Sequence, residues 1–262
     1  MSEEGKRSMN TEKKKLTGCR DLFTSSWNLY KDRFWDLISI GLISTLVLFL
    51  FQGLFILLGN VKHIPSAGVS AVALGIVNFA AILVVILVTI WASAAMLVAV
   101  SKSDESLSAV EAYRRAWVFV GKYFWVSILA ALIVISGTIL LVIPGIYLAI
   151  GLSMAPLIVI NEFDEVTIVS ALKKSREYVN GYWWAVLGRF MFLLLVLLGI
   201  GILLGIFLFL PLTFLAAMGP QFNAIFRGIG NAIVDILLTP FSTAFWFMIY
   251  AGLKQIKQSQ VS

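Results

Sequence analysis

The sequence predicts an all-α membrane protein with six transmembrane helices, built as three repeated units of an interfacial amphipathic helix followed by a two-helix hairpin. Hydrophobic residues make up 60% of the 262 residues and charged residues 13%, whereas soluble domains average about half apolar and about a quarter charged. The apolar residues lie in long unbroken runs, as in membrane-spanning helices. A short aromatic pattern also occurs three times, which predicts the repeat.

Each copy of the pattern is an amphipathic stretch that ends in an aromatic pair and continues directly into an apolar run. The three pairs are Phe34-Trp35, Phe124-Trp125 and Trp183-Trp184. At the same spacing before each pair stand Trp27, Trp117 and Arg176. Aromatic residues are enriched at membrane interfaces, so each pair is predicted to mark the depth at which the chain enters the membrane.

Six apolar runs are the predicted spans, and a helix needs about 20 residues to cross about 30 Å of hydrocarbon. In chain order they cover about 35–58, part of 69–100, 126–142, 146–160, 189–210 and part of 229–253. The third and fourth are short, so either they cross a thinned region of the membrane or they form a partial hairpin. Pro144-Gly145 predicts a sharp turn between them, because Pro interrupts a helix and Gly admits turn geometry.

The predicted domains are a disordered cytoplasmic tail over 1–15, a six-span membrane domain over 16–253, and a cytoplasmic tail over 254–262. The units within the membrane domain cover about 16–100, 104–160 and 164–253. Most Lys and Arg residues lie in the N-terminal segment, the second and fourth connections and the C-terminal tail, whereas the opposite side carries Lys62 and Arg227. The positive-inside rule therefore predicts a multi-pass protein of the cell membrane with both termini in the cytoplasm.

The amphipathic stretches have apolar residues at helical spacing, as Phe23, Trp27 and Tyr30 show in the first. In the second, Ser108 and Glu111 predict a helix-capping box. Such helices lie in the membrane interface with basic residues near lipid phosphates. Two interpretations follow: the three helices form a cytoplasmic collar that binds anionic lipid, or they only anchor and orient the bundle.

Ionisable residues within or beside the spans are candidates for function. Arg189 lies at the start of the fifth span and is expected to extend back to the cytoplasmic surface. Asp235 lies roughly 27 Å along the helix from Leu253, so we expect it near the far interface, where Arg227 is the closest charge in sequence. Asp235, Asn231 and Arg227 form an outer mouth or ion-coupling site, or they are ordinary interfacial residues. Within the spans, Gly201 and Gly205 suggest close helix contact.

No catalytic, cofactor-binding or metal-binding residue is predicted, and no cofactor. Cys19 is the only cysteine and His63 the only histidine, so neither an intrachain disulfide nor a Cys/His metal site can form. Known hydrolase and phosphate-binding motifs are missing from the sequence. Nucleic acid is not an expected partner, because the basic residues lie beside apolar runs, where they act as topology signals.

One region carries a more specific pattern. It reads Ile143-Pro144-Gly145-Ile146-Tyr147-Leu148, then Ala155-Pro156, Glu162, Ala171 to Ser175 and Gly181 to Trp184. This pattern resembles a prokaryotic membrane-protein family that includes the membrane domain of some glycerophosphoryl diester phosphodiesterases. The sequence departs from it at Gly151, where Arg is usual, and at Arg176, where Trp is usual. The resemblance implies a six-span membrane protein, and because the phosphodiesterase barrel is missing, it implies no diesterase activity.

Together these patterns predict a non-enzymatic integral membrane protein with a scaffolding or lipid-associated role. The expected partners are membrane lipids, including anionic ones, and a membrane protein or a second copy of the chain. The alternative is a carrier for a small molecule or lipid, since internal repeats and a kinked span at Pro240 occur in transporters.

Overall fold

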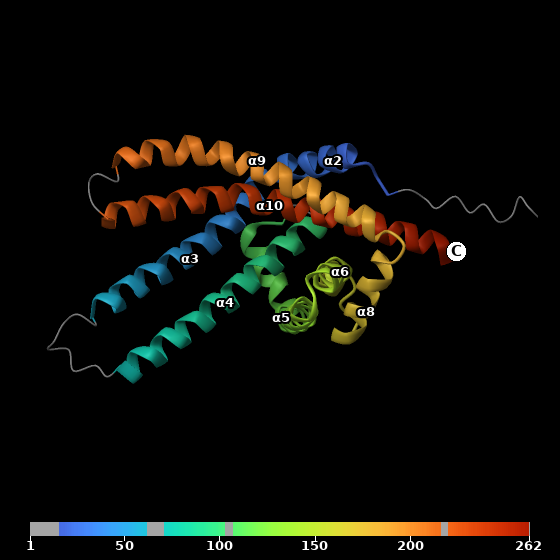
Figure 1. Ribbon diagram of the computed structural model, residues 1–262, viewed down its shortest axis with the longest axis horizontal. Coiled ribbons are helices and arrows are strands. Elements are labelled where there is room, and N and C mark those ends of the chain that lie inside the picture. Colours follow the sequence, from blue (N-terminus) through green and yellow to red (C-terminus); the bar gives the residue numbers. More distant parts are fainter. Residues whose placement is uncertain (1–15, 62–70, 103–106, 216–219, 262) are drawn as a thin grey trace, which may run out of the picture.

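The computed structural model describes residues 16–61, 71–102, 107–215 and 220–261, and all regular structure within these ranges is helical (Figure 1). The helices are α2 (Cys19–Asp32), α3 (Phe34–Val61), α4 (Ala71–Ser101), α5 (Ala109–Leu140), α6 (Val142–Leu152), α7 (Ala155–Asn161), α8 (Ile168–Val179), α9 (Trp183–Leu215) and α10 (Pro220–Val261). Six segments of the described chain are long and apolar enough to span a membrane. The chain is therefore an all-α, multi-pass membrane protein; the predicted tail over 1–15 lies outside the described residues.

Spans that follow one another in the chain pack together: α3 with α4, α4 with α5, α5 with α6, and α9 with α10. Figure 1 shows α3, α4, α9 and α10 extending along the long axis of the molecule, whereas α5 and α6 are seen nearly end-on. The α5–α6 hairpin therefore runs across the direction of the other four helices. With 11 residues, α6 is about 16 Å long, which is shorter than the hydrocarbon core; α7 follows it after a break at Ser153 and Met154.

The three amphipathic stretches do not have the same structure. The first and third are the separate helices α2 and α8. Helix α2 ends at Asp32 with Arg33 as its C-cap, and α8 ends at Val179 before a turn that contains Gly181, whose φ is +84°. The second stretch has no such break, and it forms the first turns of the continuous 32-residue helix α5. Half of the predicted capping box is present: Ser108 caps this helix by accepting a hydrogen bond from the Glu111 N–H at 3.3 Å, whereas the Glu111 carboxylate binds Arg114 and Arg115.

The aromatic stripe of α2 packs within the bundle. Phe23 lies edge-on to Phe241 of α10 at 5.5 Å and to Phe192 of α9 at 6.4 Å, while Trp27 and Tyr30 also contact Phe241. Much of the apolar face of α2 thus covers α9 and α10, so this helix is a packed part of the fold.

The turn between α5 and α6 lies at Leu141, and the prediction of a turn at Pro144-Gly145 is therefore wrong by one helical turn. Leu141 has extended backbone angles and caps both helices. Pro144 falls in the first turn of α6, where a missing N–H does little harm. Gly145 is required for a different reason: a Cβ atom there would lie 2.1 Å from Thr138 Oγ1, so the two helices could not approach as they do.

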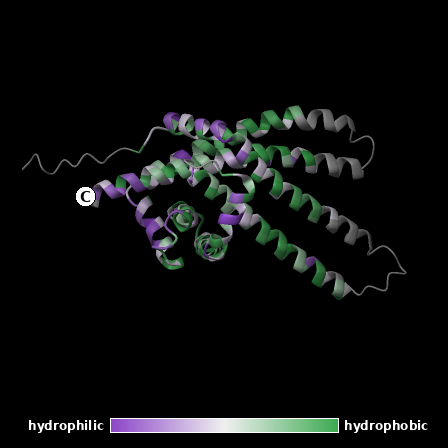
Figure 2. Cartoon of the chain, turned by 180° about the vertical axis from the view of Figure 1, so that it is seen from behind, coloured by the Kyte–Doolittle hydropathy of each residue, from purple (hydrophilic) through white to green (hydrophobic). Residues whose placement is uncertain are grey.

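The buried core gathers at one end of the molecule, where α2, α7, α8, the end of α4 and the C-terminal part of α10 meet. Figure 2 shows hydrophilic residues concentrated at this end, which we call the basic end, and apolar residues along the helices that extend from it. Gly201 and Gly205 lie on α9 away from this core. A Cβ atom at either position would meet no atom within 4 Å, so the predicted close contact does not occur among the residues that the structure describes.

Candidate functional site

Several basic side chains at the basic end bind main-chain carbonyls, and these bonds fix how the helices meet. Arg33 Nη1 donates to the carbonyls of Ala99 at 2.8 Å and Lys102 at 3.3 Å, which caps the end of α4. Lys122 Nζ donates to the carbonyls of Phe163 at 2.7 Å and Val166 at 3.1 Å. Cations suit the C-terminal end of a helix because the helix dipole is negative there. The role of these residues is therefore structural.

Glu162 connects three helices at the basic end. It directly follows α7, and its side chain is 3% exposed. Lys254 Nζ of α10 lies 2.9 Å from its Oε1, and Lys174 Nζ of α8 contacts its Oε2. Tyr178 and Tyr250 donate to Oε1 at 3.1 and 2.8 Å. Two lysines and two hydroxyl donors from α8 and α10 thus surround this buried carboxylate, so the cluster holds α7, α8 and α10 together.

The electrostatics of the Glu162 cluster favour the ionised carboxylate. Burial raises the pKa of Glu162, but hydrogen bonds from Lys174, Lys254 and Tyr250 outweigh burial and lower its pKa to about 2. Burial and the neighbouring Glu162 charge together raise the pKa of Tyr178, which therefore stays protonated as a donor. Neither group is placed to exchange protons near neutral pH, which argues for a structural cluster.

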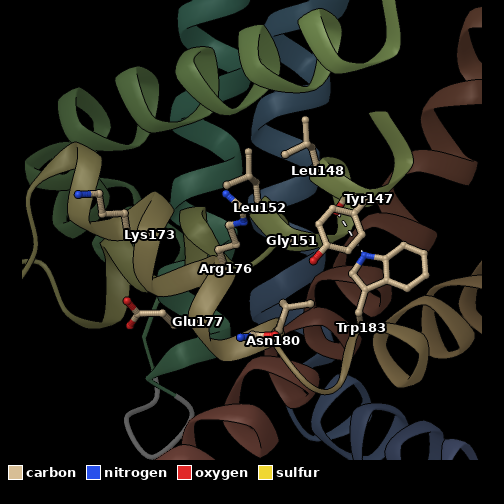
Figure 3. A pocket seen from close by; sticks show the side chains of 10 residues that line it. Tyr147, Leu148, Gly151, Leu152, Lys173, Arg176, Glu177, Asn180 and Trp183 are labelled. Carbon is tan, nitrogen blue, oxygen red and sulfur yellow. Dashed lines mark hydrogen bonds between the residues drawn. The ribbon is translucent and has the colours of Figure 1, made fainter. Parts of the chain in front are cut away.

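A pocket of roughly 360 Å³ opens at the basic end between α6, α8 and the start of α9 (Figure 3). Its polar lining comes from Lys173, Arg176, Glu177 and Asn180. Its other lining residues are apolar or aromatic: Tyr147, Leu148, Gly151, Leu152, Val179 and Trp183. We call it the α6–α8 groove.

The aromatic side of the α6–α8 groove is ordered by α6. Tyr147 and Trp183 stack with ring centroids 5.5 Å apart, and the Trp183 indole N–H donates to the Tyr147 carbonyl at 3.2 Å (Figure 3). Ser175 donates to the Gly151 carbonyl at 2.8 Å, which ties α8 to α6. The two positions that depart from the resembled pattern are neighbours, since a Cβ atom on Gly151 would lie 3.8 Å from Arg176 Cγ.

The basic residues of the predicted collar fall into two groups. Arg114 and Arg115 bind the Glu111 carboxylate at 3.0 and 2.9 Å, and Lys174 binds Glu162. Lys173 and Arg176, by contrast, are exposed in the α6–α8 groove, and neither forms an ion pair with another described residue. The groove therefore brings two unpaired cations together, whereas Arg20 and Lys31 of α2, which are also exposed and form no ion pair with a described residue, do not line it. Sequence spacing could not separate the two groups, because pairing depends on which helices meet.

A second pocket, of roughly 490 Å³, lies among the spans, and we call it the inter-span cavity. Its lining comes from α3, α4, α5, α10 and the α6–α7 junction. Many of the lining residues carry hydroxyl groups: Ser44, Thr45, Thr89, Ser93, Tyr123, Ser153, Thr239 and Thr243. Asp235 is the charged member of the lining, and Trp246 adds an aromatic ring.

The expectation that Asp235 lies near the far interface is wrong. Gly41 of α3 faces the next residue of α10, with an added Cβ 3.6 Å from Ile236 Cα. Gly41 is two turns into α3, so Asp235 lies about 10 Å from the Phe34 end of that helix. The estimate failed because it placed the end of the span at Leu253, whereas α10 continues to Val261 and packs along α2.

The other polar and charged residues that were candidates for function do not join Asp235. Arg189 is 7% exposed, and it donates to the carbonyls of Ala185 at 2.7 Å and of Thr17, so it is held inside the basic end instead of reaching the surface. The side chain of Arg227 lies outside the described residues. Asn231 is exposed on α10 and does not line the inter-span cavity.

Comparisons with known proteins agree with a membrane protein. The chain is 31% identical over 143 residues to a UPF0259 membrane protein of Pectobacterium carotovorum subsp. carotovorum, and this match covers 55% of the chain and 54% of the relative. The chain thus spans about half the length of the curated relative it matches. No family model and no solved structure matches, and none of the comparisons shows the resemblance to the phosphodiesterase membrane domain.

Proposed function

We propose that this chain is a non-enzymatic, lipid-associated protein of the cytoplasmic membrane, and that the α6–α8 groove binds the headgroup of an anionic lipid. The observation that carries this proposal is the placement of Lys173 and Arg176, two exposed cations without carboxylate partners among the described residues, beside the Tyr147–Trp183 stack. Orientation of the basic end toward the cytoplasm supports it, since that leaflet is anionic and attracts basic residues.

The groove chemistry suits a phosphate-bearing headgroup at the membrane surface. Arg176 offers a planar guanidinium that can bind phosphate oxygens in a bidentate manner, and Lys173 adds a point charge. Asn180 can donate to a third oxygen. Leu148 and Leu152 of α6 provide an apolar wall for the start of an acyl chain, while tryptophan and tyrosine rings suit headgroup depth. Glu177 lowers the net positive charge of the groove. The groove is therefore better suited to bind a single headgroup than to attract an anionic membrane surface in general.

Lipid retention measured by native mass spectrometry tests the proposal. The purified protein would be delipidated in detergent and titrated with phosphatidylglycerol and with zwitterionic phosphatidylcholine of the same acyl chains. We expect preferential binding of the anionic lipid and a roughly 10–30-fold loss in a Lys173→Ala/Arg176→Ala variant, because each basic residue near an anionic surface contributes about 1 kcal/mol.

The matched control is an Arg114→Ala/Arg115→Ala variant, which removes the same charge from cations that are already paired with Glu111. Its lipid affinity should remain close to that of the unmodified protein. Equal losses in both variants would show that net charge alone attracts the lipid, and an unchanged affinity in the groove variant would contradict the proposal.

A further inference from the structure

The inter-span cavity offers hydrogen-bond acceptors more than donors. Five of its lining hydroxyls donate to carbonyls of their own helices at 2.7–2.9 Å: Ser44, Thr89, Ser93, Ser153 and Thr243. A hydroxyl has one proton to donate and two lone pairs. Because the proton is used within the helix, what remains for a ligand is the acceptor side of each group.

The backbone of α10 adds to this acceptor character. Pro240 lies inside α10 and has no N–H to donate to the Ile236 carbonyl one turn earlier. Ile236 lines the cavity, so a main-chain acceptor without its usual helical partner lies at the level of Asp235. Asp235 contributes two more acceptor oxygens and a negative charge.

The negative charge of Asp235 in the cavity requires a compensating positive charge, a proton or water. Asp235 is exposed, and it is the one charged residue among the described residues that line the cavity. A carboxylate about 10 Å inside the Phe34 end of α3 is costly within a membrane unless a cation, a proton or water compensates it. The aromatic side chains of Tyr123 and Trp246 can also stabilise a cation.

We infer that the inter-span cavity binds a primary ammonium group, supplied by a small free amine or by the headgroup of an aminophospholipid. Three N–H donors and one positive charge complement a site of hydroxyl lone pairs and one carboxylate. The volume of roughly 490 Å³ falls within the usual range of small-molecule sites and exceeds the need of a single bare ion. This inference is independent of the groove, which binds the opposite charge with other residues.

A size-matched series of probes tests the inference. The purified protein in lipid discs without aminophospholipid would be titrated by calorimetry with n-butylammonium, 1-butanol and butyrate, which differ in charge but little in size. We expect saturable binding of butylammonium, at least tenfold weaker binding of butanol, and none of butyrate. Equal affinity for butanol, or preference for butyrate, would overturn the assignment.

Two variants connect binding to the cavity. Asp235→Asn keeps the shape of the side chain and should weaken butylammonium binding at least tenfold, whereas Asp36→Asn removes an acid from the first turn of α3 outside the cavity and should have no effect. Unchanged affinity in Asp235→Asn would refute the inference. If that variant unfolds, a Thr239→Val variant should still weaken binding severalfold, and a full-affinity result there would refute the inference as well.

Further experiments distinguish whether the ammonium group comes from a free amine or from a lipid headgroup. Discs that contain phosphatidylethanolamine would compete with butylammonium if the headgroup is the natural ligand, and would not compete if a free amine is; each result supports an ammonium site. A sodium titration is the counter-test. If sodium binds through Asp235 and butylammonium does not, the site is one for an inorganic cation and the inference fails.

Discussion

At the scale of single residues, Glu162 receives donors from two helices that are distant in sequence. Tyr178 and Lys174 belong to α8, and Tyr250 and Lys254 belong to α10. Removing one partner from a buried ion cluster leaves the other charges without compensation, and this cost usually exceeds the net stabilisation of the intact cluster. The carboxylate is therefore a point at which a small chemical change affects three helices.

A Glu162→Gln variant should lower the free energy of unfolding by about 2–4 kcal/mol, a range that allows for the partial exposure of both lysines. The thermal midpoint in detergent would report this loss. Glu111→Gln is the matched control, since Glu111 also binds two cations but does so on the surface. Similar midpoints for the two variants would show that the buried cluster contributes no more than a surface pair.

Acid should act through the same carboxylate. The pKa of Glu162 is about 2 in the folded protein against an ordinary value of 4.5, so the unfolded chain takes up this proton first as the pH falls. The stabilisation is therefore complete above about pH 4.5 and is lost as the pH falls toward 2. The free energy of unfolding, measured by tryptophan fluorescence between pH 4.5 and pH 2, should fall with decreasing pH in the unmodified protein. It should fall less steeply in Glu162→Gln.

At the scale of elements, the sequence predicted the six spans and the Ser108 cap but not the different forms of the three amphipathic stretches. Spacing of apolar residues is the same in a separate helix and in the first turns of a longer one. After α8 the chain turns at Gly181, which has a positive φ. The second stretch has no such residue and continues into α5. The turn at Leu141 was missed because leucine is not a turn-forming residue, whereas Gly145, which suggested a turn, instead allows the close approach of α6 to Thr138.

The position of the α5–α6 hairpin tip relative to the membrane can be predicted separately. Residues 139–143 are 63–81% exposed and wholly apolar, so we expect them to lie in lipid. A spin label in an Ile143→Cys variant of a Cys19→Ser protein should collide more often with membrane-soluble oxygen than with a water-soluble nickel chelate. A label at Arg114, 77% exposed at the basic end, should show the reverse. Chelate-dominated collisions at both positions would place the hairpin tip in water.

At the scale of the whole molecule, some basic side chains are bound within the fold and others remain exposed to a ligand. The sequence identified the basic residues near the spans, but Arg33, Lys122 and Lys174 proved to be bound by carbonyls or by Glu162. Which cations remain available depends on contacts between helices far apart in the chain. For the same reason, the depth of Asp235 became clear only from the pairing of α3 with α10.

The single native cysteine makes the proposed orientation testable. Cys19 is partly exposed on α2 at the basic end, so a membrane-impermeant maleimide should label it in inverted vesicles and leave it unlabelled in intact cells. A Gln258→Cys variant of a Cys19→Ser protein should behave in the same way, because Gln258 lies exposed near the end of α10. Labelling from outside intact cells would show that the basic end faces outward. The groove would then not face the anionic cytoplasmic leaflet.

The Glu162 cluster also bears on the order of events during synthesis. The ribosome makes Glu162 16 residues before Tyr178, so the first donors reach it while the chain is still growing. Tyr250 follows only after 88 residues, and Lys254 comes later still. A nascent chain that has inserted α9 but not α10 therefore holds a half-compensated carboxylate between α7 and α8. Docking of α10 supplies the two remaining partners, so the carboxylate is fully compensated only after both α8 and α10 are in place.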